Sequence, residues 1–123
     1  MSEGNASEDH TSRRHVYLLD YLMIMRQDMM KGLLGTHLGD INVARMVAFV
    51  DGYLSCQDIN GIKDEEYGRF FHWLRDVKHE FPPEGWDAKY LRDCGGDHEH
   101  AIRKFFDFVA EFVALREREK QGG

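Results

Sequence analysis

Residues 94–100 read Cys-Gly-Gly-Asp-His-Glu-His, a stretch whose residue types could bind a metal ion, supply a reactive thiol or hold a phosphate. His98 and His100 would point about 200° apart on a helix, so they could share one metal ion only in an extended segment. An acid directly after two glycines, with a second acid in the next turn, is typical of a helix start. We therefore predict that a helix begins at Asp97.

The same stretch offers two further chemistries. Cys94 and His98 could act as a nucleophile and its base, but no third group stands at a recognisable spacing to orient the imidazole. Paired glycines before a helix can bind phosphate through backbone N–H groups, yet Asp97 places a carboxylate where the anion would sit. The simpler interpretation is that Cys94 and Cys56 are free thiols, with Cys56 a small residue of the core.

Three side chains that can bind metals, His72, Asp76 and His79, are separated by four and three residues. On a helix this spacing places them in one stripe, where two imidazoles and a carboxylate could hold a divalent metal. A solvated helix face opposite an apolar stripe shows the same pattern. We predict the solvated face and no cofactor, and we keep a metal-binding enzyme or sensor as the alternative function.

Acidic residues are concentrated in the middle of the chain, whose formal net charge is −6. Residues 40–99 hold 13 acids and 7 bases, whereas the two ends are nearly neutral. Such a field repels phosphate backbones and attracts basic proteins. We therefore expect a basic protein as partner and no nucleic acid.

The segment from Glu80 to Asp87 places an aromatic residue among acids and two prolines. Tyr and Trp carry much of the binding energy at interface centres, and flanking acids speed the encounter with a basic surface. The predicted partner-binding residues come from this segment and an earlier acidic one: Asp58, Asp64, Glu65, Glu66, Glu84, Trp86, Asp87 and Tyr90. The alternative for Trp86 and Tyr90 is that they dock a short helix on the rest of the domain.

The elements that must position these residues are all predicted to be helical. Apolar periodicity and stop signals place the helices at about residues 15–34, 40–58, 64–81, 86–93 and 97–119. Asp40 is the predicted N-cap of the second helix, and Pro82-Pro83 is the predicted end of the third. We expect an all-α, single-domain helical bundle of four main helices plus one short helix, centred on the second and last helices.

The bundle should cover residues 15–119, between a disordered N-terminal tail at 1–14 and a flexible C-terminal tail at 120–123. The start of the chain lacks the apolar core of a signal peptide. The longest apolar run, residues 16–25, contains Asp20 and is shorter than the ~20 residues that span a bilayer. We expect a cytoplasmic protein without a membrane partner. The broad apolar face of the last helix leaves a homodimeric scaffold as a further alternative.

The stretch from about Ala48 to Phe112 contains several short motifs: Gly52-Tyr53, Asn60-Gly61, Phe71, Trp73-Leu74-Arg75, Gly85-Trp86, Tyr90-Leu91 and Gly96-Asp97-His98. In this pattern the chain resembles the small, all-helical immunity proteins of bacterial polymorphic toxin systems. The resemblance implies a non-enzymatic, cytoplasmic toxin inhibitor that covers the active or functional surface of one cognate toxin. Many immunity proteins are acidic because their toxins are basic nucleases, and the charge of this chain agrees with that.

Overall fold

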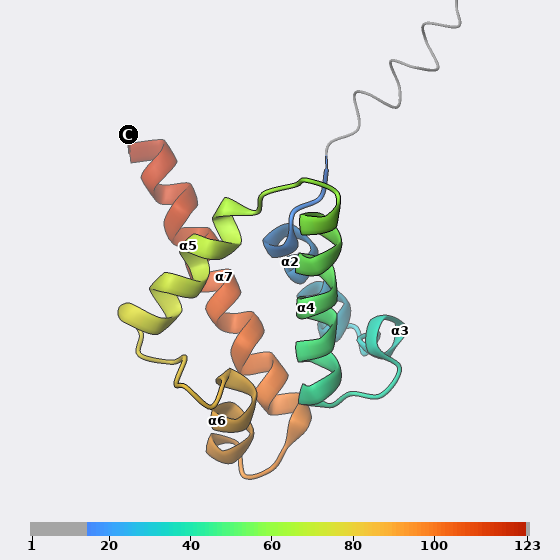
Figure 1. The fold of residues 1–123 in the computed structure, drawn as a ribbon. Helices are drawn as coiled ribbons and strands as arrows, with labels where there is room; N and C mark the ends of the chain where they lie inside the picture. The colour runs from blue at the N-terminus through green and yellow to red at the C-terminus, as the bar shows by residue number, and fades with distance from the viewer. Residues whose placement is uncertain (1–14, 123) are drawn as a thin grey trace, which may run out of the picture.

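The computed structural model describes residues 15–122, and every regular element among them is a helix (Figure 1). The helices are α2 (Leu18–Met30), α3 (Gly35–Leu38), α4 (Val43–Ile59), α5 (Glu65–Asp76), α6 (Trp86–Asp93) and α7 (His98–Gly122). The all-α prediction is thus confirmed for the described residues, and none of these helices has the length and apolar character needed to cross a membrane. The predicted disordered tail at 1–14 lies outside them.

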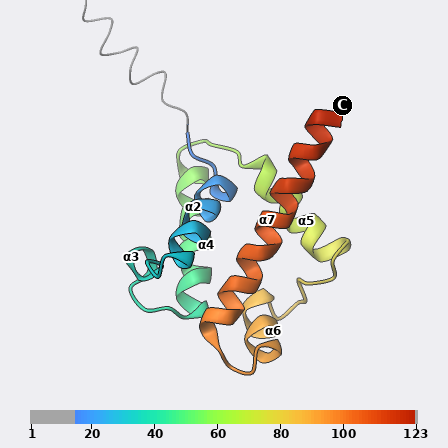
Figure 2. The same ribbon diagram turned by 180° about the vertical axis from the view of Figure 1, so that it is seen from behind.

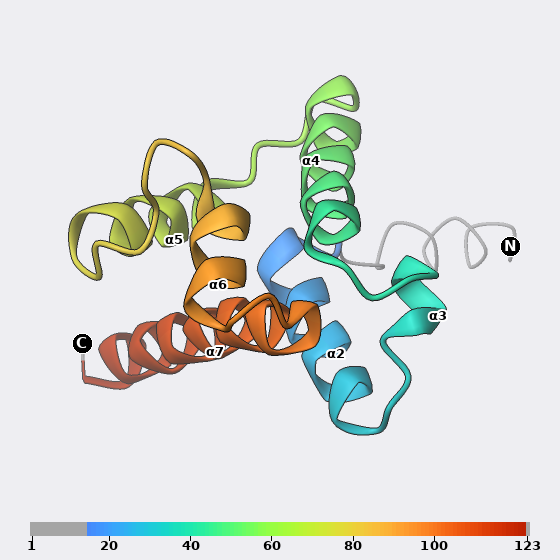
Figure 3. The ribbon, with the colours of Figure 1, turned by 90° about the horizontal axis from the view of Figure 1, so that it is seen from below.

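The long helix α7 is the element on which the others pack. α2, α4, α5 and α6 all contact it, and Figure 3 shows α5 and α6 on one side of the molecule with α3 and α4 on the other. The side chains of its inward stripe are at most 4% exposed: Ala101, Ile102, Phe105, Phe106, Val109 and Phe112. Burying one such large side chain stabilises a fold by about 1.5–3 kcal/mol. This stripe is therefore covered within one chain, whereas Phe108, Val113 and Leu115, which widen the apolar face, are only partly buried.

α4 packs against α7 and also contacts α2, α3 and α6, but it is not buried on all sides. Its buried residues form a single inward stripe, consisting of Val43, Met46, Val50 and Gln57. Ala44 and Ala48 on its outer face are exposed, and so is Cys56, which was expected in the core. Val47, Phe49, Tyr53 and Leu54 are partly buried and pack against the core beside this stripe, so α4 has one packed face and one exposed face.

The first predicted helix, 15–34, is shorter in the structure. α2 ends at Met30, and the chain then turns through Gly32, whose φ of +76° is a left-handed conformation that glycine adopts without steric cost. The backbone N–H of Leu33 donates to the carbonyl of Asp28 at 2.8 Å and closes the helix. Gly35 therefore does not break a helix but begins the short α3.

Two side chains accept hydrogen bonds from backbone N–H groups in the first turn of α4. The N-cap is Asn42, whose Oδ1 accepts the backbone N–H of Arg45 at 2.8 Å, so the prediction of Asp40 is wrong by two residues. His98 Nδ1 accepts the backbone N–H of Val43 at 3.1 Å. This imidazole from the start of α7 thus ties the N-terminal ends of two helices together.

The start of α7 agrees with the prediction from residues 94–100. Asp97 Oδ1 accepts the backbone N–H of His100 at 3.0 Å, and this bond lowers the pKa of the Asp97 carboxyl. The helix continues to Gly122, so residues 120–122 are helical rather than a tail beginning after Glu119. Gly123 lies outside the described residues.

α5 ends five residues earlier than predicted. Its last residue is Asp76, and Val77, directly after it, is 63% exposed. His79 then adopts a φ of +58°, which reverses the chain so that the N–H of Glu80 donates to the carbonyl of Leu74. The helix is closed before the two prolines are reached. α6 spans Trp86–Asp93 as predicted, and Gly95-Gly96 follows it.

A network of four charges holds the connection after α5 against α6 and α7. Lys89 Nζ lies 2.7 Å from Asp93 Oδ2 and 3.0 Å from Glu80 Oε1, and Lys104 Nζ lies 3.0 Å from the same Asp93 oxygen. Among the described residues, Glu80 Oε1 accepts no well-directed hydrogen bond, so its attraction to Lys89 is that of an ion pair. The alternating charges hold together segments from three parts of the chain.

Asp93 is expected to weaken this network when it becomes protonated. Hydrogen bonds from Lys89 and Lys104 lower its pKa to about 2 in the folded protein, against about 3.9 for an unfolded chain. Because the folded pKa is the lower one, Asp93 stabilises the fold above about pH 4 and loses that contribution as the pH falls toward about 2. Between about pH 4 and pH 2, the free energy of unfolding of Asp93→Asn should therefore fall less than that of the unchanged chain. Urea denaturation at several pH values measures the difference.

Lys104→Gln provides an intermediate control. It removes the charge of one of the two groups that lower the Asp93 pKa, so the folded pKa should rise toward the unfolded value. The loss of stability should then begin at the same pH, about 4, but be smaller than in the unchanged chain and complete at a higher pH. Equal slopes for Asp93→Asn and the unchanged chain would contradict the assignment.

Candidate functional site

The predicted partner-binding residues fall into two groups at opposite ends of the molecule. Asp58, Asp64, Glu65 and Glu66 surround the α4–α5 connection at the top of Figures 1 and 2. The second group lies in or next to α6 at the bottom of the same views: Glu84, Trp86, Asp87 and Tyr90. One small interface could not use both groups.

Trp86 and Tyr90 are core residues and cannot contribute contact area to a partner in this fold. The Trp86 ring is 4% exposed and stacks on Phe105, with ring centroids 4.2 Å apart. The Tyr90 hydroxyl donates to the carbonyl of Glu80 at 2.9 Å, and burial raises the pKa of the Tyr90 phenol. The docking alternative for this pair is therefore the correct one, because α6 is held on α7 by these two rings.

The stripe of His72, Asp76 and His79 is not formed. α5 ends at Asp76, and His79 lies beyond it in a left-handed conformation, so the three side chains do not share a helix face. Asp76 instead accepts two hydrogen bonds from Arg75, which lower the pKa of its carboxyl. Within residues 15–122, no three His, Cys, Asp or Glu side chains are grouped so that they could hold a metal ion.

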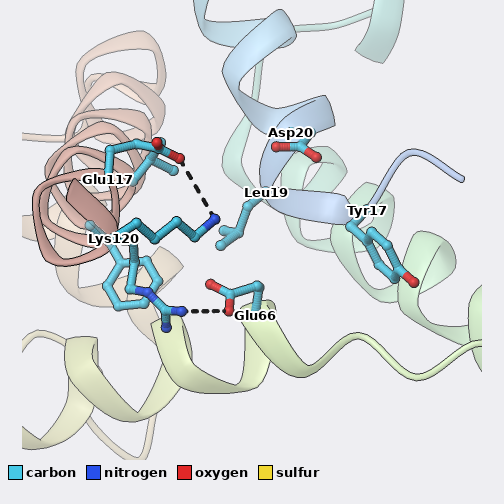
Figure 4. Close-up of a pocket in the computed structure, with 9 residues that line it drawn as sticks. Tyr17, Leu19, Asp20, Glu66, Glu117 and Lys120 are labelled. Atoms are coloured by element: carbon cyan, nitrogen blue, oxygen red, sulfur yellow. Dashed lines mark ion pairs between the residues drawn. The ribbon is translucent and has the colours of Figure 1, made fainter. Parts of the chain in front are cut away.

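A charged crevice opens where α2, α5 and α7 meet, at the same end of the molecule as the α4–α5 connection (Figure 4). Its volume is about 180 Å³. Leu19 and Phe112, both nearly buried, form part of its apolar lining together with Val113. Around this lining stand five charged side chains, Asp20, Glu66, Arg116, Glu117 and Lys120, with Tyr17 at the outer edge.

Ion pairs occupy most of the charges in the crevice. Glu66 Oε2 lies 3.0 Å from an Arg116 nitrogen and 2.6 Å from Arg69 Nη1. Lys120 reaches back across the crevice toward Leu19 and pairs loosely with Glu117 at 3.9 Å (Figure 4). Asp20 forms no ion pair within the described part of the chain. Among residues 15–122, the crevice thus keeps one carboxylate that pairs with no cation, next to an apolar lining.

A second depression adjoins the crevice and shares Tyr17 and Glu66 with it. The start of α5 and the residues before it complete its lining: Lys63, Asp64, Glu65 and Arg69. Three of the eight predicted partner-binding residues therefore lie on one continuous hollow surface. Asp58 is exposed on the last turn of α4 at the same end of the molecule.

Asp64 forms hydrogen bonds to three segments at this end of the molecule. Its Oδ1 caps α5 by accepting the backbone N–H of Tyr67, and its Oδ2 accepts both the N–H of Leu18 and Gln57 Nε2. Gln57 is 3% exposed, and its Oε1 lies 2.6 Å from His15 Nε2. One carboxylate therefore fixes the starts of α2 and α5 relative to the end of α4, and so positions the lining of both depressions.

Sequence reasoning missed the contributions of α2 and α7 to this surface. Asp20, Tyr17 and Glu117 are far from the acidic middle of the chain and were not selected. A signal for Asp20 existed, because it is the single charged residue in the apolar run 16–25. An acid retained in such a run lies on the outer face of the helix, here beside the crevice.

Comparison of the chain with known protein families, with curated proteins and with solved structures gives no match. The fold and site define an all-α domain with a charged, partly apolar crevice at one end.

Proposed function

We propose that this chain is a non-enzymatic protein-binding domain that acts as an immunity protein. It would bind a basic toxin domain in the cytoplasm of a bacterium and cover the active or functional surface of that toxin. The resemblance of residues 48–112 to immunity proteins supports this proposal, as does the excess of acids in the middle of the chain.

The main supporting observation is that acids from three helices meet around one hollow surface. Asp20 comes from α2, Glu65 and Glu66 from α5, and Glu117 from α7. Within the described residues, Asp20 and Glu65 form no ion pair, whereas the nearby Arg69 and Arg116 are both engaged by Glu66. Tyr17, 40% exposed, adds apolar area beside them.

This arrangement suits recognition of a basic surface. Unpaired carboxylates at the rim speed the encounter with a positively charged protein, and aromatic and aliphatic groups supply contact area when the surfaces meet. Glu84 and Asp87, at the other end of the molecule, are not part of the proposed interface. The proposal therefore narrows the predicted set to the end that carries Asp58 and residues 64–66.

Charge reversal at this end is expected to weaken partner binding. A tagged chain is used to capture proteins from its native host, and the captured protein is tested for growth inhibition when expressed alone and together with the chain. Asp20→Lys combined with Glu65→Lys should weaken binding about tenfold or more, because steering charges and rim ion pairs are inverted. Isothermal calorimetry with the purified partner measures the change.

Glu84→Lys combined with Asp87→Lys is the matched control, since it changes the net charge by the same amount at the opposite end. It should bind nearly as the unchanged chain does. The proposal is refuted if no basic growth-inhibiting protein is captured, or if both double variants bind equally well.

A further inference from the structure

The charged crevice has the form of a receptor for a long side chain with a positive charge at its tip. Its lining combines apolar groups from Leu19, Phe112 and Val113 with the carboxylates of Asp20 and Glu117. Arg116, which also lines it, is already paired with Glu66. Lys and Arg side chains match such a site, because they bury an apolar stem along hydrophobic surface and keep their charged end at a polar edge. An acidic or purely apolar side chain would match only part of it.

The crevice already holds such a group. Lys120 extends its stem across the crevice toward Leu19 (Figure 4), and its Nζ lies 3.9 Å from Glu117 Oε2. This pairing is loose: the Lys120 side chain is 66% exposed and that of Glu117 is 60% exposed. Exposed pairs of this kind contribute little to stability, so Lys120 can leave at small cost.

We propose that the crevice binds one arginine or lysine side chain of a protein partner, and that this side chain displaces Lys120. The partner's stem would pack on Leu19, Phe112 and Val113, and its charge would meet Asp20 and Glu117. This inference rests on the proposed function for the source of the side chain. It adds what that function leaves open: the kind of residue that the partner must present at this point.

Arginine is the better occupant of the two. Its planar guanidinium is less strongly hydrated than an ammonium and can donate to two carboxylates at once. Asp20 and Glu117 line the crevice from different helices, α2 and α7, so a group with several donors pointing in different directions suits it better than a single-point charge. The guanidinium would also replace the positive charge that Lys120 withdraws.

The test uses the full chain and the blocked peptide acetyl-Gly-Gly-Arg-Gly-Gly-amide, followed by NMR chemical shifts. Saturable shift changes are expected at Leu19, Phe112 and Val113. In two control peptides the arginine is replaced. Citrulline keeps the shape of the side chain but has no charge, and norleucine keeps only an apolar stem. Each control peptide should bind at least about fivefold more weakly than the arginine peptide. Equal binding of the three peptides, or shifts spread over the whole surface, would overturn the inference.

Substitutions locate the binding site within the molecule. Asp20→Asn should weaken arginine peptide binding about fivefold, whereas Asp87→Asn at the other end should leave it unchanged. Lys120→Ala should strengthen binding, because the resident side chain is removed. Lys63→Ala is its matched control: it removes the same charge from the adjoining depression without opening the crevice, and it should have a smaller effect.

The outcomes separate this inference from the proposed function. Loss of toxin binding on charge reversal, without any binding of the arginine peptide, would refute the inference and leave the function standing. Specific binding of the arginine peptide, without capture of any basic protein, would support the crevice as a cation site and refute the immunity function.

Discussion

Replacing Trp86 by alanine is expected to lower the free energy of unfolding by about 3–5 kcal/mol, the usual range for a buried Trp or Phe cut to Ala. The ring is stacked on Phe105 at 4.2 Å and also packs against Tyr90, so its removal leaves a cavity between α6 and α7. Domains of this size are commonly stable by only about 5–15 kcal/mol. Urea denaturation followed by circular dichroism would measure the loss.

Two substitutions separate packing from partner recognition. Trp86→Phe keeps an aromatic ring on Phe105 and should cost much less than alanine. Tyr17→Ala removes an aromatic that is 40% exposed and should change stability by only about 0.5 kcal/mol. A small effect of Trp86→Ala on unfolding, together with a large effect on partner binding, would show that the ring serves an interface after all.

Features determined by neighbouring residues were predictable from the sequence. The helices predicted at 40–58 and 64–81 end and begin, respectively, within one residue of α4 and α5: Asp64 caps α5, and Gly61, just after α4, has a φ of +74°. The helix start at residues 94–100 belongs to the same group. In each case the residues that decide the conformation lie within one turn of the boundary.

Features determined by distant contacts were not predictable in this way. α5 ends at Asp76 because the chain after it is held elsewhere: Lys78 pairs with Glu111 of α7 at 2.9 Å, and the carbonyl of Glu80 accepts the hydroxyl of Tyr90. Pro82-Pro83 would stop a helix, but α5 has already ended at Asp76. The burial of Trp86 likewise depends on where Phe105 lies.

The candidate site shows the same division. Acidity near residues 64–66 is visible in the sequence, but the crevice exists only because α2 and the end of α7 meet α5 there. Asp64 illustrates both sides of the problem. The sequence identifies it as an acid at a helix start, whereas its bonds to Leu18 and Gln57 depend on segments more distant in the chain.

Asp64→Ala is expected to destabilise the fold by about 3–5 kcal/mol, although Asp64 lies at the surface end of a helix. The substitution removes three hydrogen bonds to one carboxylate, and bonds to charged groups contribute about 1.5–3 kcal/mol each, with less than full additivity. It also leaves the side chain of Gln57, 3% exposed, without its acceptor. Urea denaturation at neutral pH measures the effect.

Asp64→Asn should recover only part of this loss, for a geometric reason. One carboxylate oxygen accepts the N–H of Tyr67, and the other accepts both Leu18 N–H and Gln57 Nε2. An asparagine has a single acceptor oxygen, so one of these two positions must hold an NH₂ group facing a donor. The matched control is Glu65→Ala, which removes the next, exposed acid and should change stability by only about 0.5 kcal/mol.

The two positions should also differ in their effect on binding, and this difference tests the assignment of Asp64. Because Asp64 joins the starts of α2 and α5, its loss should broaden the NMR signals of both crevice walls and weaken partner binding through disorder of the site. Glu65→Ala should weaken binding while leaving the signals sharp. If Asp64→Ala were as stable as the unchanged chain but failed to bind, Asp64 would be a direct contact residue, and the architecture described for this end of the molecule would be wrong.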